Sequence, residues 1–220
     1  MIAYDHDGDS AIFDSKNNTN SLVVHVPYNV RHLIVEFYAD LKDDYCELDN
    51  FEVDLFACLL DSSGRVPNNE YMMFYNNSYL LESDSSKEYY IDRRWIWGFP
   101  DEVAGAYYLH LDILPEEIES IVFFCSIYDA KNLKYDYDMC NYVRMRIGDS
   151  SLLNPEGNLD GETEKRATLA QWEESSNLKN VSVISFATLQ RTTDGWDVLR
   201  NEGSLYSEIE DVCRSYGVQL

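Results

Sequence analysis

Short runs in which apolar and polar residues alternate cover most of the chain, and they predict β-strands. Successive side chains of a strand point to opposite faces, so a strand with one buried face shows a period of two. Runs of this kind lie at 21–27, 32–41, 54–60, 70–77, 88–92, 106–112 and 142–149. Turn-forming residues separate them, which indicates a protein built mainly from antiparallel strands.

Two further segments carry a stronger signal. The segment 120–129, SIVFFCSIYD, is apolar at both alternating sets of positions, which is typical of a strand buried between two layers. The segment 181–199 contains two β-rich runs around Thr-Thr-Asp-Gly, a turn sequence that favours a hairpin.

Two segments have helical patterns. The segment 162–174 is rich in helix formers and has a modest apolar stripe, and it predicts a short helix. The segment 204–217 has apolar residues at helical spacing, with Ser204 suited to begin the helix and Gly217 suited to end it. Its apolar stripe is Leu205, Ile209, Val212 and Tyr216.

Many short strands, one doubly buried strand and a terminal helix predict a mostly β fold. We expect a two-sheet β-sandwich with a C-terminal helix and one additional short helix. Residues 21–220 are expected to form a single domain, because the strand pattern resumes after the polar segment 149–161. Residues 1–20 are expected to be an acidic N-terminal tail.

One strand begins in an unusual way. In FEVDLFACLL (51–60), the face formed by alternate residues from Phe51 is apolar throughout, whereas the opposite face begins with Glu52 and Asp54. Two carboxylates on one face lie roughly 6.5–7 Å apart along a strand. Either water solvates them, or a hard divalent cation lies between them, since such ions take several oxygen ligands.

Charge excludes some classes of partner. The 17 basic and 40 acidic residues give a formal net charge of −23. Such a chain is poorly suited to bind nucleic acid or anionic lipid directly, and it favours cations, basic partners or simply solubility. No apolar run reaches the ~18 residues that span a bilayer, so no membrane insertion is expected. The first residues lack the basic and apolar regions of a secretion signal, and a cytoplasmic protein is predicted.

The cysteines and the catalytic motifs add little chemistry. Five cysteines are scattered along the chain without zinc-ligand spacing, and Cys58 and Cys125 lie within apolar runs that predict core positions. No nucleophile-elbow, phosphate-loop or dinucleotide motif is present in the sequence. The chain is therefore expected not to be an enzyme.

Three segments of the chain have a recognisable order. They are FEVDLFACLLDSSGRV (51–66), MMFYNN (72–77) and LPEEIESIVFFCSIYDA (114–130). In sequence and in order they resemble segments of the TerD-like family of tellurium-resistance and stress proteins. The C-terminal hairpin, the helix and the closing YGV (216–218) follow in the family's order. The resemblance extends from about residue 21 to the end, with poor agreement at 78–106 and 150–180.

The resemblance implies a two-sheet sandwich that binds calcium through acidic loops at one end. Glu52 and Asp54 occupy the two acidic positions of the family's strand motif, and Asp92 occupies the aspartate of a Gly-Asp-Asn loop. We add Asp129, from the Asp-Ala pair after the doubly apolar strand, as a fourth metal ligand.

The sequence also departs from the family pattern. Ile91 and Arg93 replace the Gly and Asn beside Asp92, and the later paired aspartates fall at about Gly105 and Ala106. An aromatic and basic loop takes the place of an acidic one. It offers an alternative site, for a protein partner, because Trp and Arg often anchor interfaces. The residues assigned to this partner-binding loop are Arg93, Arg94, Trp95, Trp97 and Phe99.

Two hypotheses of function follow. The first is a non-enzymatic, TerD-like stress or resistance protein that binds calcium weakly through a degenerate acidic site. The second is a metal-free interaction module that docks an unidentified protein partner through the Arg93–Phe99 loop.

Overall fold

The computed structural model describes most of the chain. The described residues are 2–4, 10–12, 23–27, 29–45, 48, 51–74, 79–81, 89–95, 102–152, 168–175, 178–201 and 205–219. For 2–4, 10–12, 27, 79–81, 89–95 and 102–104 the description covers the backbone alone.

Strands make up most of the described chain. They are β1 (Ile2–Tyr4), β2 (Ser10–Ile12), β3 (Val23–Pro27), β4 (His32–Leu41), β5 (Val53–Leu60), β6 (Met72–Met73), β7 (Tyr79–Leu81), β8 (Tyr89–Trp95), β9 (Glu102–His110), β10 (Ser120–Ile127), β11 (Cys140–Asp149), β12 (Thr168–Glu174), β13 (Val183–Thr192), β14 (Gly195–Arg200) and β15 (Leu205–Tyr206). The α-helices are α1 (Ala130–Leu133) and α3 (Ile209–Tyr216). Neither of these helices is long and apolar enough to cross a membrane.

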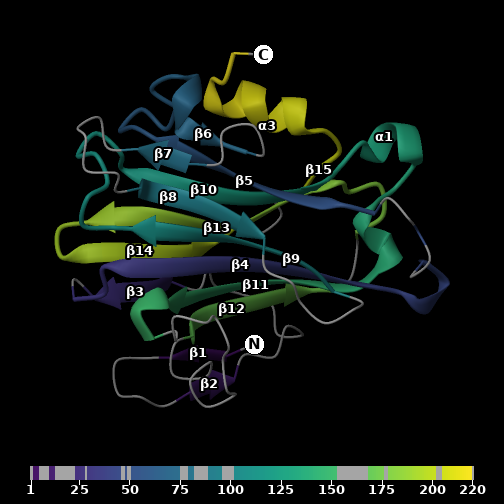
Figure 1. The fold of residues 1–220 in the computed structure, drawn as a ribbon, viewed down its shortest axis with the longest axis horizontal. Helices are drawn as coiled ribbons and strands as arrows, with labels where there is room; N and C mark the ends of the chain where they lie inside the picture. Colours follow the sequence, from purple (N-terminus) through teal and green to yellow (C-terminus); the bar gives the residue numbers. More distant parts are fainter. Residues whose placement is uncertain are drawn as a thin grey trace.

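Two antiparallel sheets face each other (Figure 1). One has the order β3-β14-β13-β10-β5-β6, with β15 paired to β13 as its seventh strand, and the other has the six-strand order β12-β11-β4-β9-β8-β7. The hairpin predicted within 181–199 is confirmed, because β13 pairs with β14 across a turn at Thr193 and Asp194. The predicted two-sheet β-sandwich with a C-terminal helix is confirmed.

The main core lies between the sheets. The apolar face predicted for 51–59 is buried there together with the inner residues of β4, β10 and β13. The hydroxyl of Tyr107 on β9 lies 3.0 Å from the carbonyl oxygen of Leu55 and 3.1 Å from that of Met73. Gly105 lies where the sheets approach closely, since a Cβ there would be 3.1 Å from Leu55 Cδ1. Backbone polar groups and close packing thus join β9 to β5 across the sandwich.

The strand β10 is buried on both faces, as the sequence predicts. Ile121 and Phe123 point into the core between the sheets. Val122 and Phe124 point outward into a second apolar cluster, which the helix α3 covers with Val212. The seven-stranded sheet is therefore the middle layer of three at this part of the molecule.

The C-terminal helix is shorter than predicted. It begins at Ile209 rather than near Ser204, because Leu205 and Tyr206 form β15 and pair with β13. The spacing of apolar residues predicts that Leu205 belongs to the helix, but pairing with β13 places it in a strand instead. The Leu205 side chain is exposed. The predicted end at Gly217 is confirmed: its φ of 78° is left-handed, a conformation that glycine adopts without strain.

The prediction of a helix over 162–174 is wrong for the part that the structure describes. Residues 168–174 form β12, which pairs with β11, while 162–167 lie outside the described residues. Thr168, Ala170 and Trp172 are buried and alternate with more exposed neighbours, so the operative period is two. Pairing and burial of Trp172 outweigh helix propensity here. The additional short helix exists, but it is α1 at 130–133.

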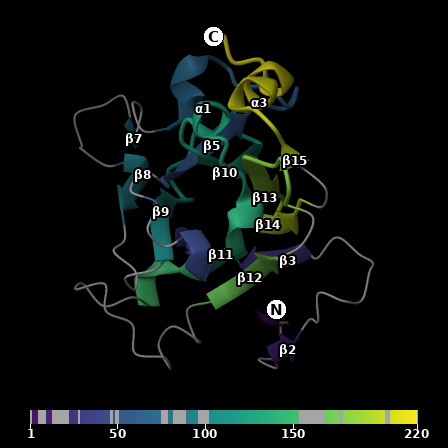
Figure 2. The same ribbon diagram turned by 90° about the vertical axis from the view of Figure 1, so that its right-hand side faces the viewer.

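The predicted N-terminal tail contains regular structure. The strands β1 and β2 form an antiparallel pair with Ile2 opposite Ile12, and β1 lies beside β12. This pair and α3 lie on opposite sides of the molecule (Figure 2). The division into a tail at 1–20 and one domain at 21–220 stays a prediction.

Replacing Gly217 by alanine is expected to lower the free energy of unfolding by about 1 kcal/mol, because the left-handed backbone strains an L-residue with a Cβ. The added Cβ would have space, since its nearest neighbour is the flexible Arg65 side chain at 3.4 Å. Urea unfolding measures the effect. Gly217→Asn should cost less, because asparagine tolerates this conformation. Equal losses for the two variants would contradict the backbone explanation.

Candidate functional site

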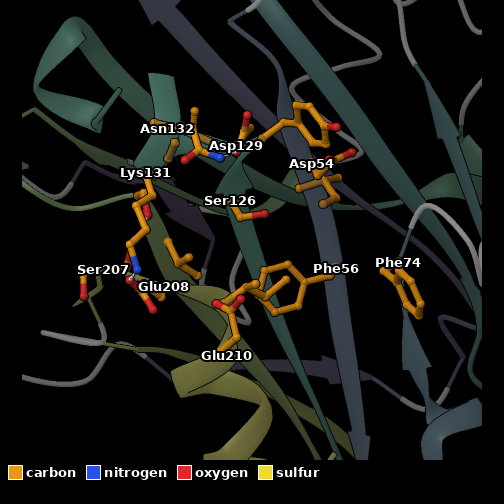
Figure 3. A pocket seen from close by; sticks show the side chains of 17 residues that line it. Asp54, Phe56, Phe74, Ser126, Asp129, Lys131, Asn132, Ser207, Glu208 and Glu210 are labelled. Carbon is orange, nitrogen blue, oxygen red and sulfur yellow. Dashed lines mark hydrogen bonds and ion pairs between the residues drawn. The ribbon is translucent and has the colours of Figure 1, made fainter. Parts of the chain in front are cut away.

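A pocket of about 340 Å³ opens at the end of the molecule where β5 begins and β10 ends. The turn leading into α1 and the first turn of α3 complete its walls (Figure 3). The carboxylate residues that line it are Asp54, Asp129, Glu208 and Glu210. Its volume is within the range of small-ligand pockets.

Asp54 lies just beyond the part of β5 that α3 covers. The next residues on the same outer face of β5, Phe56, Cys58 and Leu60, are buried beneath the helix. Asp54 is only partly buried and lines the pocket instead. Its partner across the ladder is Ser126 of β10. The outer face of the strand begins with an acid because a pocket, rather than the helix, covers that end of β5.

Asp129 is held in an unusual backbone conformation. Its φ of 48° and ψ of 29° are left-handed, a region that aspartate and asparagine enter more readily than most residues. The amide of Asn132 donates a hydrogen bond to Asp129 Oδ1 at 2.6 Å, and the backbone N–H groups of Asn132 and Leu133 donate to the Asp129 carbonyl. These bonds orient the Asp129 carboxylate at the rim of the pocket.

The pocket has an excess of negative charge. Four of its lining residues carry carboxylates, and Lys131 is its one basic lining residue in the described chain. Lys131 Nζ donates a hydrogen bond of 2.5 Å to Glu208 Oε1. That hydrogen bond, together with the negative charge of Glu208, raises the pKa of Lys131. The ion pair neutralises Glu208, so Asp54, Asp129 and Glu210 make the pocket attractive to a cation.

A serine side chain also faces the pocket. Ser126 is only 8% exposed, and its side chain points into the pocket between Asp54 and Phe56 (Figure 3). Within the described part of the chain, its hydroxyl has no hydrogen-bond partner. A hydroxyl both donates and accepts hydrogen bonds, so Ser126 Oγ is suited to bind water or a ligand in the pocket.

The structure brings together two of the four residues predicted to bind metal. Asp54 and Asp129 line the same pocket. Glu52 is exposed and precedes β5, and its carbonyl accepts the N–H of Tyr128. Asp92 lies on β8 of the other sheet, and its side chain is outside the description. Nowhere among the described residues do three or more His, Cys, Asp or Glu side chains form a group that could hold a metal ion.

The two positions at which the resemblance places further acidic ligands lie within a strand. Gly105 and Ala106, where the resemblance places paired aspartates, are buried within β9. Gly105 faces Leu55 across the core, so an acidic side chain at that position would be buried in an apolar environment. Neither of these two positions supplies an acidic ligand in this chain.

The predicted partner-binding loop is a strand over its first three residues. Arg93, Arg94 and Trp95 belong to β8 and pair with residues 105–107 of β9. Describing these three residues as part of a loop was wrong, because the strand β8 extends to Trp95 and pairs with β9 there. Trp97 and Phe99 lie outside the described residues. A docking role for this segment stays a prediction.

Glu208, Glu210 and Ser126 were not predicted as site residues. The two glutamates read as ordinary acids in the first turn of a helix, and Ser126 as a small residue within an apolar strand. The only sequence signal for Ser126 is a small polar residue near the end of a strongly apolar segment, and the pairing that places it opposite Asp54 is known from the structure. The two glutamates reach the pocket because of the position in which α3 packs against the sheet.

The fold and the pocket together define a class of protein: a two-sheet antiparallel β-sandwich with an acidic pocket at one end. The chain belongs to the TerD domain family, whose sequence pattern matches residues 11–216. The resemblance seen in the sequence is thereby confirmed.

Relatives and solved structures agree with this assignment. The chain is 27% identical over 170 residues to the tellurium resistance protein TerD of Serratia marcescens, covering 77% of this chain and 79% of that protein. It is 25% identical over 170 residues, with the same coverage, to TerD of an Alcaligenes species. A solved structure of a homologue of the telluride resistance protein TerD from Streptomyces coelicolor superposes with a TM-score of 0.53 at 11% identity, over 80% of this chain and 89% of the other. That last likeness shows a shared fold.

Proposed function

We propose that this chain is a non-enzymatic protein of the tellurium-resistance type whose acidic pocket holds a divalent cation weakly, calcium being the expected ion. The main observation behind this proposal is that Asp54 and Asp129 line one pocket. Asp54 belongs to a strand and Asp129 to a turn, and the two residues are 75 positions apart in the sequence. Membership of the TerD domain family supports the resistance role.

The donor set fits a weak site. Calcium takes about 6–8 oxygen ligands, and affinity falls as carboxylates are removed. Asp54 and Asp129 offer carboxylates, Ser126 offers a hydroxyl oxygen, and water would complete the shell. With so few protein ligands, a dissociation constant of about 1 mM is expected, like that of weak extracellular calcium modules.

Calcium is expected to raise the melting temperature of the chelator-stripped protein. At about 10 mM calcium and a dissociation constant of about 1 mM, ion binding stabilises the folded state by about 1.4 kcal/mol. For a chain of this size that corresponds to a rise of roughly 3–6 °C. Asp54→Asn, which keeps the shape of the side chain and removes its charge, should abolish most of the rise.

Asp194→Asn is the matched control for this titration. Asp194 lies in the β13–β14 turn, its side chain is 78% exposed, and it lines no part of the pocket. This variant should keep the full calcium response, and magnesium should produce a smaller one, because it dehydrates reluctantly. An equal response in Asp54→Asn and Asp194→Asn, or no response of the unmodified chain, would overturn the cation proposal.

A further inference from the structure

Three sulfur-bearing side chains meet beneath the C-terminal helix, away from the acidic pocket. Cys58 comes from β5, Met72 from β6 and Cys213 from α3. Their exposed fractions are 0%, 5% and 2%, and all three belong to the apolar cluster between α3 and the seven-stranded sheet. Cys58 and Cys213 are free thiols.

The backbone brings these side chains to one point. Cys58 and Met72 are direct partners in the antiparallel β5–β6 pair, so their side chains stand next to each other on the same face. The Cys213 thiol lies over them and donates to Met72, with Sγ and Sδ 3.9 Å apart. The two thiols also interact: burial and then the neighbouring Cys213 raise the pKa of Cys58 to about 12.

The distance between the Cys213 and Met72 sulfur atoms suits a shared ion. Sulfur ligands lie about 2.3 Å from a bound metal such as zinc, and two such ligands of one ion are then roughly 3.8–4.0 Å apart. The 3.9 Å between Cys213 Sγ and Met72 Sδ falls in that range. Thiolate and thioether ligands select soft ions such as Cu(I) and reject hard ions such as calcium, which require oxygen.

We propose that Cys58, Met72 and Cys213 form a three-sulfur binding site for a soft monovalent cation of the Cu(I) and Ag(I) class. The site is independent of the acidic pocket, since none of its three residues lines that pocket. Binding joins α3 to β5 and β6 through the ion, in addition to the apolar contacts already present. Each thiol that binds the ion releases its proton to solvent, so no oxidant or reductant is needed.

Silver(I) nitrate in chloride-free buffer is the probe, because Ag(I) is a soft cation and binds without a change of its oxidation state. The experiment uses the full chain with Cys46→Ser, which removes the one cysteine outside the described residues. Native mass spectrometry should show one tightly bound Ag(I) per chain, and the melting temperature should rise with it. Binding should strengthen as pH rises from about 6 to 8, since both thiols remain protonated in the free protein at these values and must lose protons to the ion.

Met72→Leu is the decisive variant because it keeps the size of the side chain and removes only the sulfur. It should weaken Ag(I) binding about tenfold or more, given that even indirect metal partners contribute factors of about ten. Cys213→Ser should abolish the tight site. Cys140→Ser removes a buried cysteine that lies outside the apolar cluster beneath α3, and it should leave both the stoichiometry and the melting shift unchanged.

The outcomes separate cleanly. Equal Ag(I) affinity in the parent chain and in Met72→Leu, or loss of the tight ion in Cys140→Ser, overturns the three-sulfur site. Circular dichroism and the melting temperature without silver show whether Cys213→Ser is folded, and the near-isosteric Met72→Leu keeps the test valid if it is not. Calcium binding in the acidic pocket should be the same in every one of these variants.

Discussion

Replacing Arg146 by methionine is expected to lower the free energy of unfolding by about 3–5 kcal/mol, the usual cost of leaving one charge of a buried ion pair alone. Arg146 on β11 is the ladder partner of Glu36 on β4, and its guanidinium donates to Glu36 Oε2 through Nε and Nη2. The two side chains are only 5% and 4% exposed. Tyr38 adds a hydrogen bond of 3.1 Å to the other carboxylate oxygen. Urea unfolding followed by circular dichroism measures the loss.

The double variant Glu36→Leu with Arg146→Met is the control for this prediction. Removing both charges avoids leaving the buried Glu36 carboxylate without its cationic partner Arg146, and replacing a buried pair by apolar side chains is often neutral or better. The double variant should therefore regain most of the stability lost in Arg146→Met. A loss below about 1 kcal/mol for Arg146→Met would show that the pair behaves as a solvent-exposed one.

Replacing Phe124 by alanine is expected to cost about 3–5 kcal/mol, the range for truncating a fully buried aromatic side chain. Phe124 stacks on Phe56 with ring centroids 4.7 Å apart, and it meets the Tyr216 ring of α3 edge-on at 5.7 Å. Truncating Phe124 removes an aromatic ring against which α3 packs. Amide hydrogen exchange should therefore accelerate in 209–216 beyond the change in the rest of the chain.

Phe123→Ala is the matched comparison, since Phe123 is the next residue of the same strand and is equally buried on the opposite face. It should cost a similar free energy, because its ring packs within the main core near Tyr107 at a centroid distance of 6.2 Å. Exchange in α3 should then rise only in step with global unfolding. The same local acceleration of α3 in both variants would mean that the helix and the sandwich unfold as one unit.

The sequence correctly predicts those parts of the fold whose residue pattern is compatible with only one type of secondary structure. The segment 120–127 is apolar on both faces, and β10 is the strand buried between the other sheet and α3. The inner face of 51–59 is correctly predicted for the same reason. The segment 168–174 has two readings, since helix formers and an alternating burial pattern coexist there. Pairing with β11 decides between them, and that information lies about 25 residues away in the chain.

The candidate site is less predictable than the fold. Asp54 and Asp129 are identifiable as acids at a strand start and after a strand end, and the antiparallel pairing of β5 with β10 brings those two ends together. Glu208 and Glu210 depend on where α3 docks, which no local pattern fixes. The same holds for the three-sulfur site, because Cys213 reaches Met72 only through the packing of α3 on the sheet.

The short strand β6 has a consequence for the behaviour of the protein at high concentration. It is one edge of the seven-stranded sheet and contains only Met72 and Met73, while the other edge, β3, ends at Pro27, which has no N–H to donate. Within the described residues, a second copy of the chain therefore finds only two residues to pair with at β6, and at β3 it cannot accept a hydrogen bond from Pro27. The net charge of −23 adds repulsion between copies. Resistance to edge-to-edge aggregation follows directly from the way this sheet ends.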